Sequence, residues 1–164
     1  MTQSSLHLDQ GETLIDDEGE LCYRQITPAL YIDGGKVATH AFGPSTSDQG
    51  KPSYSRSSLV SPQEARDWHS QNASKPSEAV YAVSVQEVVI SGTFAIDDSA
   101  TPLPQGQVRA PGHCFVDFRE LSKARIRELR AIIYRYAMAR GEIPTRPLEH
   151  EDGLFSLEDF STSE

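Results

Sequence analysis

One long amphipathic helix is the feature that most constrains how this chain can fold. The segment LSKARIRELRAIIYRYAMARG ends on Gly141, and Pro144 follows shortly beyond it as a second stop signal. Its apolar side chains recur at helical spacing, at Ile126, Leu129, Ile133, Tyr136 and Ala137. The other apolar runs are short. The sequence therefore predicts an α+β fold with a small mixed or antiparallel sheet and about three helices, the longest near 122–140.

Capping signals predict two shorter helices. In SPQEARDWHSQ, Ser61 can cap the helix, Pro62 occupies its first position, and Glu64 completes a capping box. Ser84 and Glu87 have the same spacing, and Gly92 is a plausible stop for the helix between them. We expect Trp68, on the first of these helices, to lie in the core.

The strands are expected at Cys22–Ile26, Val37–Phe42, Ala79–Val83 and His113–Phe118, and in the second of these β-branched and aromatic residues alternate with polar ones. Between the second and third strands lies STSDQGKPSYSRSSL, residues 45–59, which is rich in Ser, Gly and Pro and has almost no periodicity. We interpret it as a loop. Long loops inside compact domains often carry function.

Charge divides the chain into three parts. Residues 1–20 hold six acidic residues and no Lys or Arg, and residues 142–164 hold seven acidic residues and one Arg, although the net charge of the whole chain is only −9. The body between them carries a slight positive excess. We therefore predict an acidic N-terminal segment (1–20), a single α+β domain (21–141) and an acidic-apolar C-terminal segment (142–164).

Composition excludes several classes of protein. No run approaches the roughly 18 apolar residues of a membrane span, and the first twenty residues lack the basic and apolar regions of a signal peptide. Cys22 and Cys114 are the only cysteines, which favours two reduced thiols in a cytoplasmic protein. We expect no membrane association.

Three stretches together carry a resemblance: VATHAFGPSTSDQGKPSYSR, SPQEARDWH, and HCFVDFRELSK with MARG after it. The chain resembles an uncharacterised group of small bacterial proteins. They share an A-F-x-P segment, then Asp, Gly and Ser, an Ala-rich helix, and a His that opens a strand ending near an acid. Here the polar positions match Asp48, Gly50, Ser53 or Ser55, His113 and Asp117. The resemblance covers roughly residues 22–141 and implies one domain, but no established activity.

His113 is the first candidate for chemistry, because it follows a Pro-Gly turn and opens a predicted strand. Two histidines and a cation would suffice for phosphodiester cleavage: one imidazole takes a proton, the other gives one, and the cation holds the phosphate charge. His40, with Arg24 or Arg56, could complete such a site. The protein would then be a small toxin-like enzyme acting on RNA or a nucleotide. The alternative is that both histidines are hydrogen-bonded structural residues.

Other kinds of site have weaker support. Arg24, Tyr54 and Ser55 are residue types suited to a transferase that takes ADP-ribose from a nicotinamide dinucleotide, if one cleft holds them. Adjacent His113 and Cys114 would point to opposite faces of a strand, so we expect no metal site and no cofactor. Neither a G-x-S-x-G elbow nor a phosphate-binding glycine loop is present.

Partner binding is the first functional hypothesis from the sequence. The C-terminal segment carries large apolar residues in an acidic setting, namely Leu154, Phe155, Leu157 and Phe160. Docked in a groove, they would make this a non-enzymatic bacterial protein that acts by binding another protein. A packed terminal segment is the alternative. The basic helix 123–140 also has enough cations to contact nucleic acid, although a solvated charged face is the usual explanation.

Overall fold

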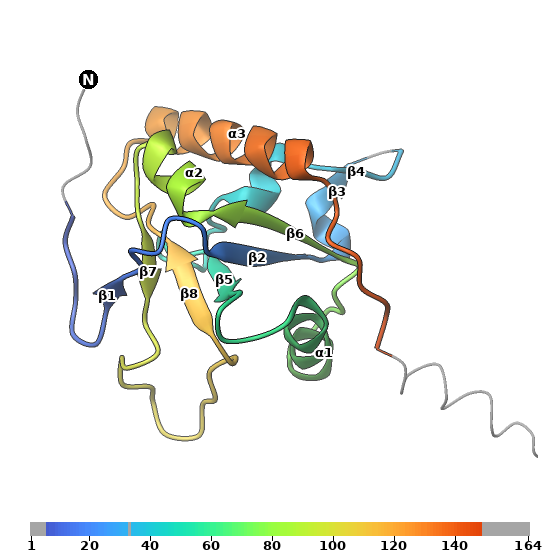
Figure 1. The fold of residues 1–164 in the computed structure, drawn as a ribbon, viewed down its shortest axis with the longest axis horizontal. Coiled ribbons are helices and arrows are strands. Elements are labelled where there is room, and N and C mark those ends of the chain that lie inside the picture. Colours follow the sequence, from blue (N-terminus) through green and yellow to red (C-terminus); the bar gives the residue numbers. More distant parts are fainter. Residues whose placement is uncertain (1–5, 33, 149–164) are drawn as a thin grey trace, which may run out of the picture.

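A central antiparallel sheet with helices on both faces forms the body of the protein (Figure 1). The computed structural model describes residues 6–32 and 34–148. Within them, six strands have the order β1-β7-β8-β5-β2-β6, and β3 pairs with β4 in a separate ribbon. The strands are β1 (Thr13–Leu14), β2 (Leu21–Ile26), β3 (Tyr31–Ile32), β4 (Lys36–Val37), β5 (Ser53–Arg56), β6 (Ala79–Ser84), β7 (Ala95–Asp97) and β8 (His113–Val116). The predicted α+β class is confirmed.

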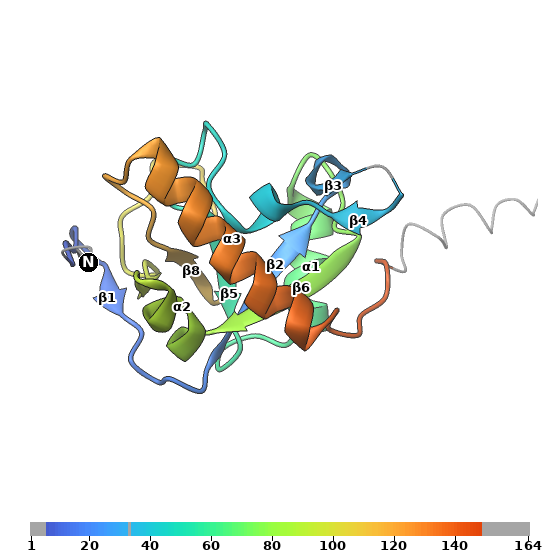
Figure 2. The same cartoon turned by 90° about the horizontal axis from the view of Figure 1, so that it is seen from above.

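Three α-helices in the described residues cover the two faces of the sheet unequally. They are α1 (Pro62–Asn72), α2 (Val85–Ser91) and α3 (Lys123–Arg140), and two 3-10 turns, η1 (Pro28–Leu30) and η2 (Thr39–Phe42), join the strands. Both α2 and α3 pack on one face, while α1 lies against the other (Figures 1 and 2). The predicted stripe on α3 is confirmed, since Leu129, Ile133 and Ala137 are fully buried against the sheet. No described helix is both long and apolar enough to cross a membrane.

The local helix signals are confirmed at the level of single hydrogen bonds. Ser61 and Glu64 form both bonds of a capping box at the start of α1, and Ser84 and Glu87 do so for α2. At the end of α2, Gly92 adopts a left-handed φ of 111°, which glycine tolerates best. These short-range patterns fix where both helices begin.

Two predictions about the segment between β2 and α1 are wrong. Of the strand expected at residues 37–42, only Val37 lies in a strand, β4, and the chain then turns through η2 to bury Phe42 completely. Residues 53–56, expected within a loop, form β5 in the middle of the sheet, between β8 and β2. Tyr54 is the only apolar residue of β5, so the strand shows no hydrophobic alternation.

The described part of the acidic N-terminal segment packs onto the sheet. Strand β1 pairs with β7 at the edge, and Ile15 is 3 % exposed in the main core. Arg119 holds the residues before β1, because its guanidinium lies 3.0 Å from Asp9 and 3.1 Å from Glu12. Residues 6–20 thus extend the folded unit beyond the expected boundary at residue 21.

A buried ion-pair network joins three parts of the sheet. The Arg56 guanidinium on β5 binds Glu20, just before β2, at 2.8 Å and Asp97, at the end of β7, at 2.7 Å. The Glu20 side chain is 2 % exposed, and Ser58 also donates to it. Because a buried carboxylate is costly unless it is paired, these contacts fix the relative positions of β2, β5 and β7.

Replacing Arg56 by Met should therefore destabilise the fold. The substitution leaves the Glu20 and Asp97 carboxylates buried without their cation, and we expect a loss of about 3–5 kcal/mol in the free energy of unfolding. Urea denaturation at neutral pH measures it. The matched control is Arg127→Met, on the exposed face of α3, which should change stability by less than about 0.5 kcal/mol. Equal stabilities of the two variants would contradict a structural role for Arg56.

The same network sets a pH dependence. Burial acts to raise the pKa of Glu20, but hydrogen bonds from Arg56 and Ser58 outweigh it and leave the pKa below its ordinary value. This stabilisation is present at neutral pH and is lost as the pH falls through the lowered pKa. In the Arg56→Met variant, burial still acts to raise the pKa of Glu20, but only the hydrogen bonds from Ser58 oppose it. The stability deficit of the variant should therefore be largest near neutral pH and shrink toward about pH 4.

Candidate functional site

A cavity of about 560 Å³ opens on the α1 face of the sheet, over β2, β5 and β8. The strand register brings polar residues into it. Ser55 on β5 is the partner of both Tyr23 on β2 and His113 on β8, so these three side chains form one row across the sheet. Ser53, two residues earlier on β5, lies on the same face. The volume falls within the roughly 300–1,000 Å³ of small-molecule sites.

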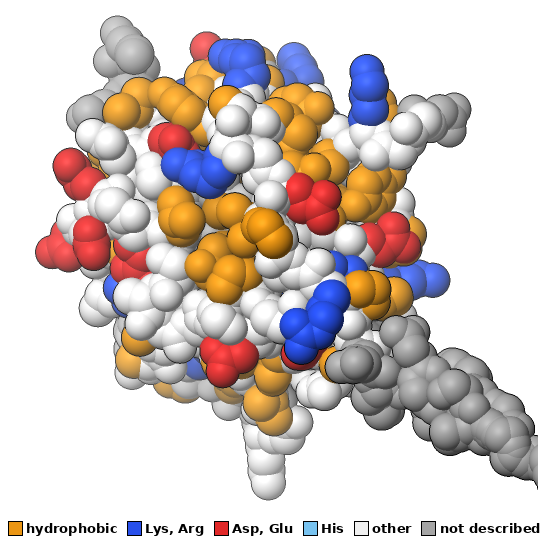
Figure 3. Space-filling model, turned by 45° about the vertical axis from the view of Figure 1, so that its right-hand side comes forward, with side chains coloured by type: hydrophobic (Ala, Val, Ile, Leu, Met, Phe, Trp, Pro, Cys, Tyr) orange, Lys and Arg blue, Asp and Glu red, His pale blue; other side chains and the backbone are white. Residues whose placement is uncertain are grey.

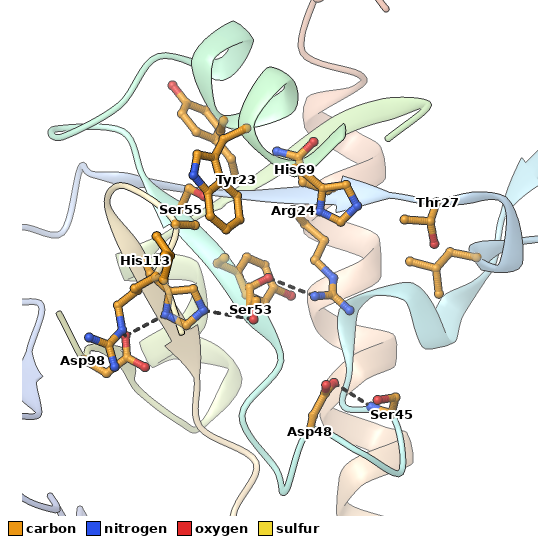
Figure 4. A pocket seen from close by; sticks show the side chains of 18 of the residues that line it. Tyr23, Arg24, Thr27, Ser45, Asp48, Ser53, Ser55, His69, Asp98 and His113 are labelled. Atoms are coloured by element: carbon orange, nitrogen blue, oxygen red, sulfur yellow. Dashed lines mark hydrogen bonds and ion pairs between the residues drawn. The ribbon is translucent and has the colours of Figure 1, made fainter. Parts of the chain in front are cut away.

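His113 lies between a carboxylate and a hydroxyl (Figure 4). Its Nδ1 is 2.7 Å from Asp98 Oδ1, and its Nε2 is 3.0 Å from Ser53 Oγ. Since an ionised carboxylate can only accept, Nδ1 carries the hydrogen in the neutral ring, and Nε2 accepts the Ser53 hydroxyl hydrogen. The side chains of His113 and Asp98 are 20 % and 13 % exposed, so the pair is shielded but reachable.

A tight turn aims His113 into the cavity. Gly112 has a φ of 67°, in the left-handed region, and the His113 N–H donates to the Ala110 carbonyl to close the turn. Asp98 comes directly after β7, whose last residue, Asp97, is bound by Arg56. The carboxylate that orients the imidazole is therefore anchored next to the buried ion-pair network.

Arg24 brings a fixed positive charge beside Ser53. Its Nε donates to the Ala41 carbonyl at 2.7 Å, and its Nη1 donates to the Ser53 carbonyl at 2.8 Å. The guanidinium also lies over the Tyr54 ring, 5.4 Å from its centre. An arginine has five N–H donors, and described residues accept from two of these. The others can bind an anion at Ser53.

The loop before β5 forms the lower wall of the site in Figure 4. Asp48 accepts from the Ser45 backbone N–H at 2.8 Å, and both residues line the cavity opposite Arg24. On the far side of Asp98, Arg109 places its Nε 4.0 Å from the Asp98 carboxylate and also lines the cavity. Cations therefore stand at two places along the wall.

The opposite wall belongs to α1. Trp68 lines the cavity instead of lying in the core, and His69 faces the same space. The His69 Nε2 lies 3.1 Å from the Lys75 carbonyl, which can only accept, so Nε2 carries the hydrogen. Burial, aided by the charge of Arg24, lowers the pKa of His69 although the Lys75 contact opposes it. The imidazole is therefore neutral at neutral pH, and its Nδ1 is an acceptor.

The structure brings together only half of the four candidate catalytic residues. Arg24 and His113 line the cavity. His40 is exposed on η2, and Arg56 lies in the network with Glu20 and Asp97; neither lines the cavity. The candidate partner-binding residues lie outside the described residues, at Leu154, Phe155, Leu157 and Phe160.

Sequence reasoning missed Asp98 as the partner of His113. The acid near the end of that strand, Asp117, binds Arg119 instead. Asp98 precedes His113 by 15 residues in a Pro/Gly loop, and no local pattern links the two. A weak signal existed for Asp48 and for either Ser53 or Ser55, which belong to the resemblance with the bacterial group, and all three line the cavity.

Metal chemistry has no built site in the described part of the chain. No group of three or more His, Cys, Asp or Glu side chains is arranged there to hold an ion. Cys22 and Cys114 are both buried and free. The cavity offers the Ser53 hydroxyl, the His113 imidazole that is hydrogen-bonded to it and oriented by Asp98, and fixed cations. That set can activate an oxygen nucleophile next to an anion.

Comparison of the chain with protein-family models, with curated proteins and with solved structures finds no match. Function is therefore inferred from the residues and geometry of the cavity. The decisive feature is the hydrogen-bonded series Ser53, His113 and Asp98. In this series Ser53 has the contacts of a nucleophile, His113 those of a base, and Asp98 those of the group that orients the base.

The orientation of the imidazole can be tested without a substrate. Asp98→Asn replaces an acceptor by an amide whose NH₂ can donate to Nδ1, so the hydrogen of neutral His113 should shift from Nδ1 to Nε2. Long-range ¹H–¹⁵N correlation spectra of the histidine ring distinguish the two tautomers. Asp48→Asn, a carboxylate change elsewhere in the cavity, should leave His113 unaltered. An Nε2–H tautomer in the unmodified protein would contradict the series.

Proposed function

We propose that this protein is an enzyme acting on a phosphate ester or anhydride of a nucleotide or RNA, with Ser53 as nucleophile, His113 as base and Arg24 as phosphate-binding cation. The observation that carries the proposal is the contact of His113 with both Ser53 and Asp98 inside a cavity that also holds Arg24. The residues that carry the resemblance to the bacterial group include Asp48, His113 and either Ser53 or Ser55, so we extend the proposal to that group.

The geometry supports a two-step transfer. His113 Nε2 takes the Ser53 proton while Ser53 Oγ bonds to phosphorus, and the leaving oxygen departs with the proton from His113. Water then attacks the phosphoserine ester, gives its proton to His113, and Ser53 Oγ leaves with that proton. Asp98 keeps the imidazole in the reactive tautomer and stabilises its positive charge during each step.

The choice of phosphate over an acyl group follows from the charges. An acyl substrate needs preorganised donors for one oxyanion, whereas a phosphate carries charge on several oxygens. The planar guanidinium of Arg24 is held by two backbone carbonyls next to Ser53 and matches two phosphate oxygens at once. Arg109 provides a second cation on the same cavity wall.

Transfer of ADP-ribose is the second candidate function. Its observation is that Arg24, Tyr54 and Ser55 all line the cavity, with the Arg24 guanidinium over the Tyr54 ring. In that reaction the nucleophile would be an acceptor hydroxyl or water, deprotonated by His113, and nicotinamide would be the leaving group. No covalent bond to Ser53 would form. The two functions therefore predict different fates for Ser53.

Covalent labelling of Ser53 tests the first function. A fluorophosphonate should phosphonylate Ser53 with loss of fluoride, as detected by intact mass and peptide mapping, because His113 activates its hydroxyl. His113→Ala should slow labelling by about 10²–10⁴-fold. The control Ser47→Ala, in the exposed loop, should label at the normal rate.

Labelling that His113→Ala does not slow would count against the proposed nucleophile. If Ser53 stays unlabelled while the protein releases nicotinamide from the dinucleotide, and Arg24→Lys suppresses that release, the second function replaces the first. If Ser53 is not labelled and the protein does not release nicotinamide, both enzymatic functions lose their support.

Protein binding through the C-terminal segment stays a separate proposal, because its residues lie outside the described part of the chain. The described residues set where that segment starts. Arg66 on α1 donates to Thr145 at 2.9 Å, Ile143 bridges to Val80 on β6, and Leu148 is 9 % exposed. Residues 142–148 are therefore part of the packed structure, and a deletion should begin after Leu148.

Deleting residues 149–164 should abolish a pull-down of the partner while the thermal transition stays nearly unchanged, because the packing around Arg66 and Leu148 is kept. A full-length variant with Leu154→Ser and Phe155→Ser is the matched test of the apolar side chains. A pull-down that survives the deletion would exclude this mode of binding.

The support for nucleic-acid binding through α3 is weaker. Two of its arginines are engaged within the fold: Arg140 binds Glu87 at 2.8 Å, and Arg125 donates to the Ser91 carbonyl at 3.1 Å. On the face seen in Figure 3, Lys and Arg side chains stand apart, with acidic and hydrophobic side chains between them. A continuous basic surface is what phosphate tracking requires.

A further inference from the structure

We propose that the part of the cavity between β2 and α1 is a subsite for the aromatic base of the nucleotide, and that Gln25 selects bases that carry a ring carbonyl. The inference rests on the proposed function, because it names the substrate end that does not react. It concerns side chains that the transfer mechanism leaves unused: Gln25 and Tyr23 on β2, and Trp68 and His69 on α1.

The first observation is an unpaired polar atom. Gln25 lines the cavity, and its amide Oε1 lies 2.6 Å from the Ser77 hydroxyl. Its Nε2 is buried and has no hydrogen-bond partner among the described residues. A buried polar group without a partner costs about 1–3 kcal/mol, so a partner that arrives with a ligand would relieve this cost.

The contacts of Ser77 decide which amide atom is left over. The Ser77 hydroxyl has one hydrogen but lies within reach of two acceptors, Gln25 Oε1 and, at 3.1 Å, the Ala79 carbonyl. The contact with Gln25 is the shorter one, and its 2.6 Å is the length of an O–H···O bond, whereas an N–H···O bond is about 2.7–3.2 Å long. The Ser77 hydroxyl therefore donates to Gln25 Oε1, and the atom without a partner is the donor Nε2.

An acceptor faces the same space. The His69 imidazole donates its only hydrogen to the Lys75 carbonyl, which leaves Nδ1 able to accept. These two side chains therefore offer one donor, Gln25 Nε2, and one acceptor, His69 Nδ1. A ring carbonyl next to a ring N–H is the complementary chemistry, whereas an exocyclic NH₂ group at the same place would meet the Gln25 N–H.

Aromatic surfaces supply the stacking. Trp68 lines the cavity from α1, and Tyr23, 7 % exposed, lines it from β2. Stacking of a base on an aromatic side chain contributes about 1–3 kcal/mol. Because Arg24 lines the same cavity, a base held here would keep its phosphate within reach of the guanidinium beside Ser53.

The protein carries its own reporter for this subsite, because Trp68 is its single tryptophan. Titration with inosine 5′-monophosphate should quench Trp68 fluorescence. Adenosine 5′-monophosphate, which has an amino group in place of the carbonyl, should bind about tenfold more weakly, since one buried hydrogen bond is lost. Ribose 5-phosphate, which has no base, should leave the fluorescence unchanged.

A matched pair of variants assigns the selectivity. Gln25→Met keeps the length of the side chain but removes the donor, and it should reduce the preference for the inosine nucleotide to about one. Gln86→Met, exposed on α2 and far from the cavity, should keep the preference. The comparison of the two nucleotides uses the unmodified protein, so the test stands even if the Gln25 variant does not fold.

Equal affinity for the two nucleotides, a preference for the adenine nucleotide, or the absence of quenching would overturn the inference. Fluorophosphonate labelling of Ser53 does not depend on a base. Labelling without nucleotide selectivity would therefore refute the base subsite and leave the proposed reaction standing. Selectivity without labelling would refute the proposed reaction and leave the base subsite standing.

Discussion

The alternation of side chains along β5 is the constraint on which the rest of the structure depends. Successive residues of a strand point to opposite faces. Tyr54 and Arg56 point toward the α3 face, where one donates to the Phe42 carbonyl and the other binds Glu20 and Asp97. Ser53 and Ser55 point toward the α1 face and line the cavity. Four residues thus provide the central packing on one side and the candidate chemistry on the other.

The two faces are coupled through the end of β7. Arg56 holds Asp97, and the next residue, Asp98, holds His113. Successive side chains point to opposite faces of the sheet. Fixing the Asp97 carboxylate on the α3 face therefore also fixes the backbone from which Asp98 reaches the cavity. Arg56 therefore supports the site by position, through the backbone, without contacting any ligand. This role accounts for a conspicuous arginine next to the site that is not part of it.

Sequence analysis predicts the parts of this fold that depend on neighbours along the chain. The caps of α1 and α2 and the stripe of α3 are local patterns, and all three are confirmed. The contact between Ser53 and His113 joins residues 60 positions apart, and it exists only because β5 pairs with β8 in one register. A single sequence contains no signal for that register. His113 could be selected for its position, but its partners Ser53 and Asp98 could not.

The misreading of β5 has a physical cause that applies beyond this chain. A strand whose outer face lines a polar cavity cannot show the apolar alternation by which strands are recognised, because one face must stay hydrophilic to do chemistry. In SYSR the serines face the cavity, and the arginine on the other face is neutralised by buried carboxylates. The residues that make the segment look like a loop are therefore the ones that form the site. Conflict between local pattern and final fold is concentrated where function places its own demands on the sequence.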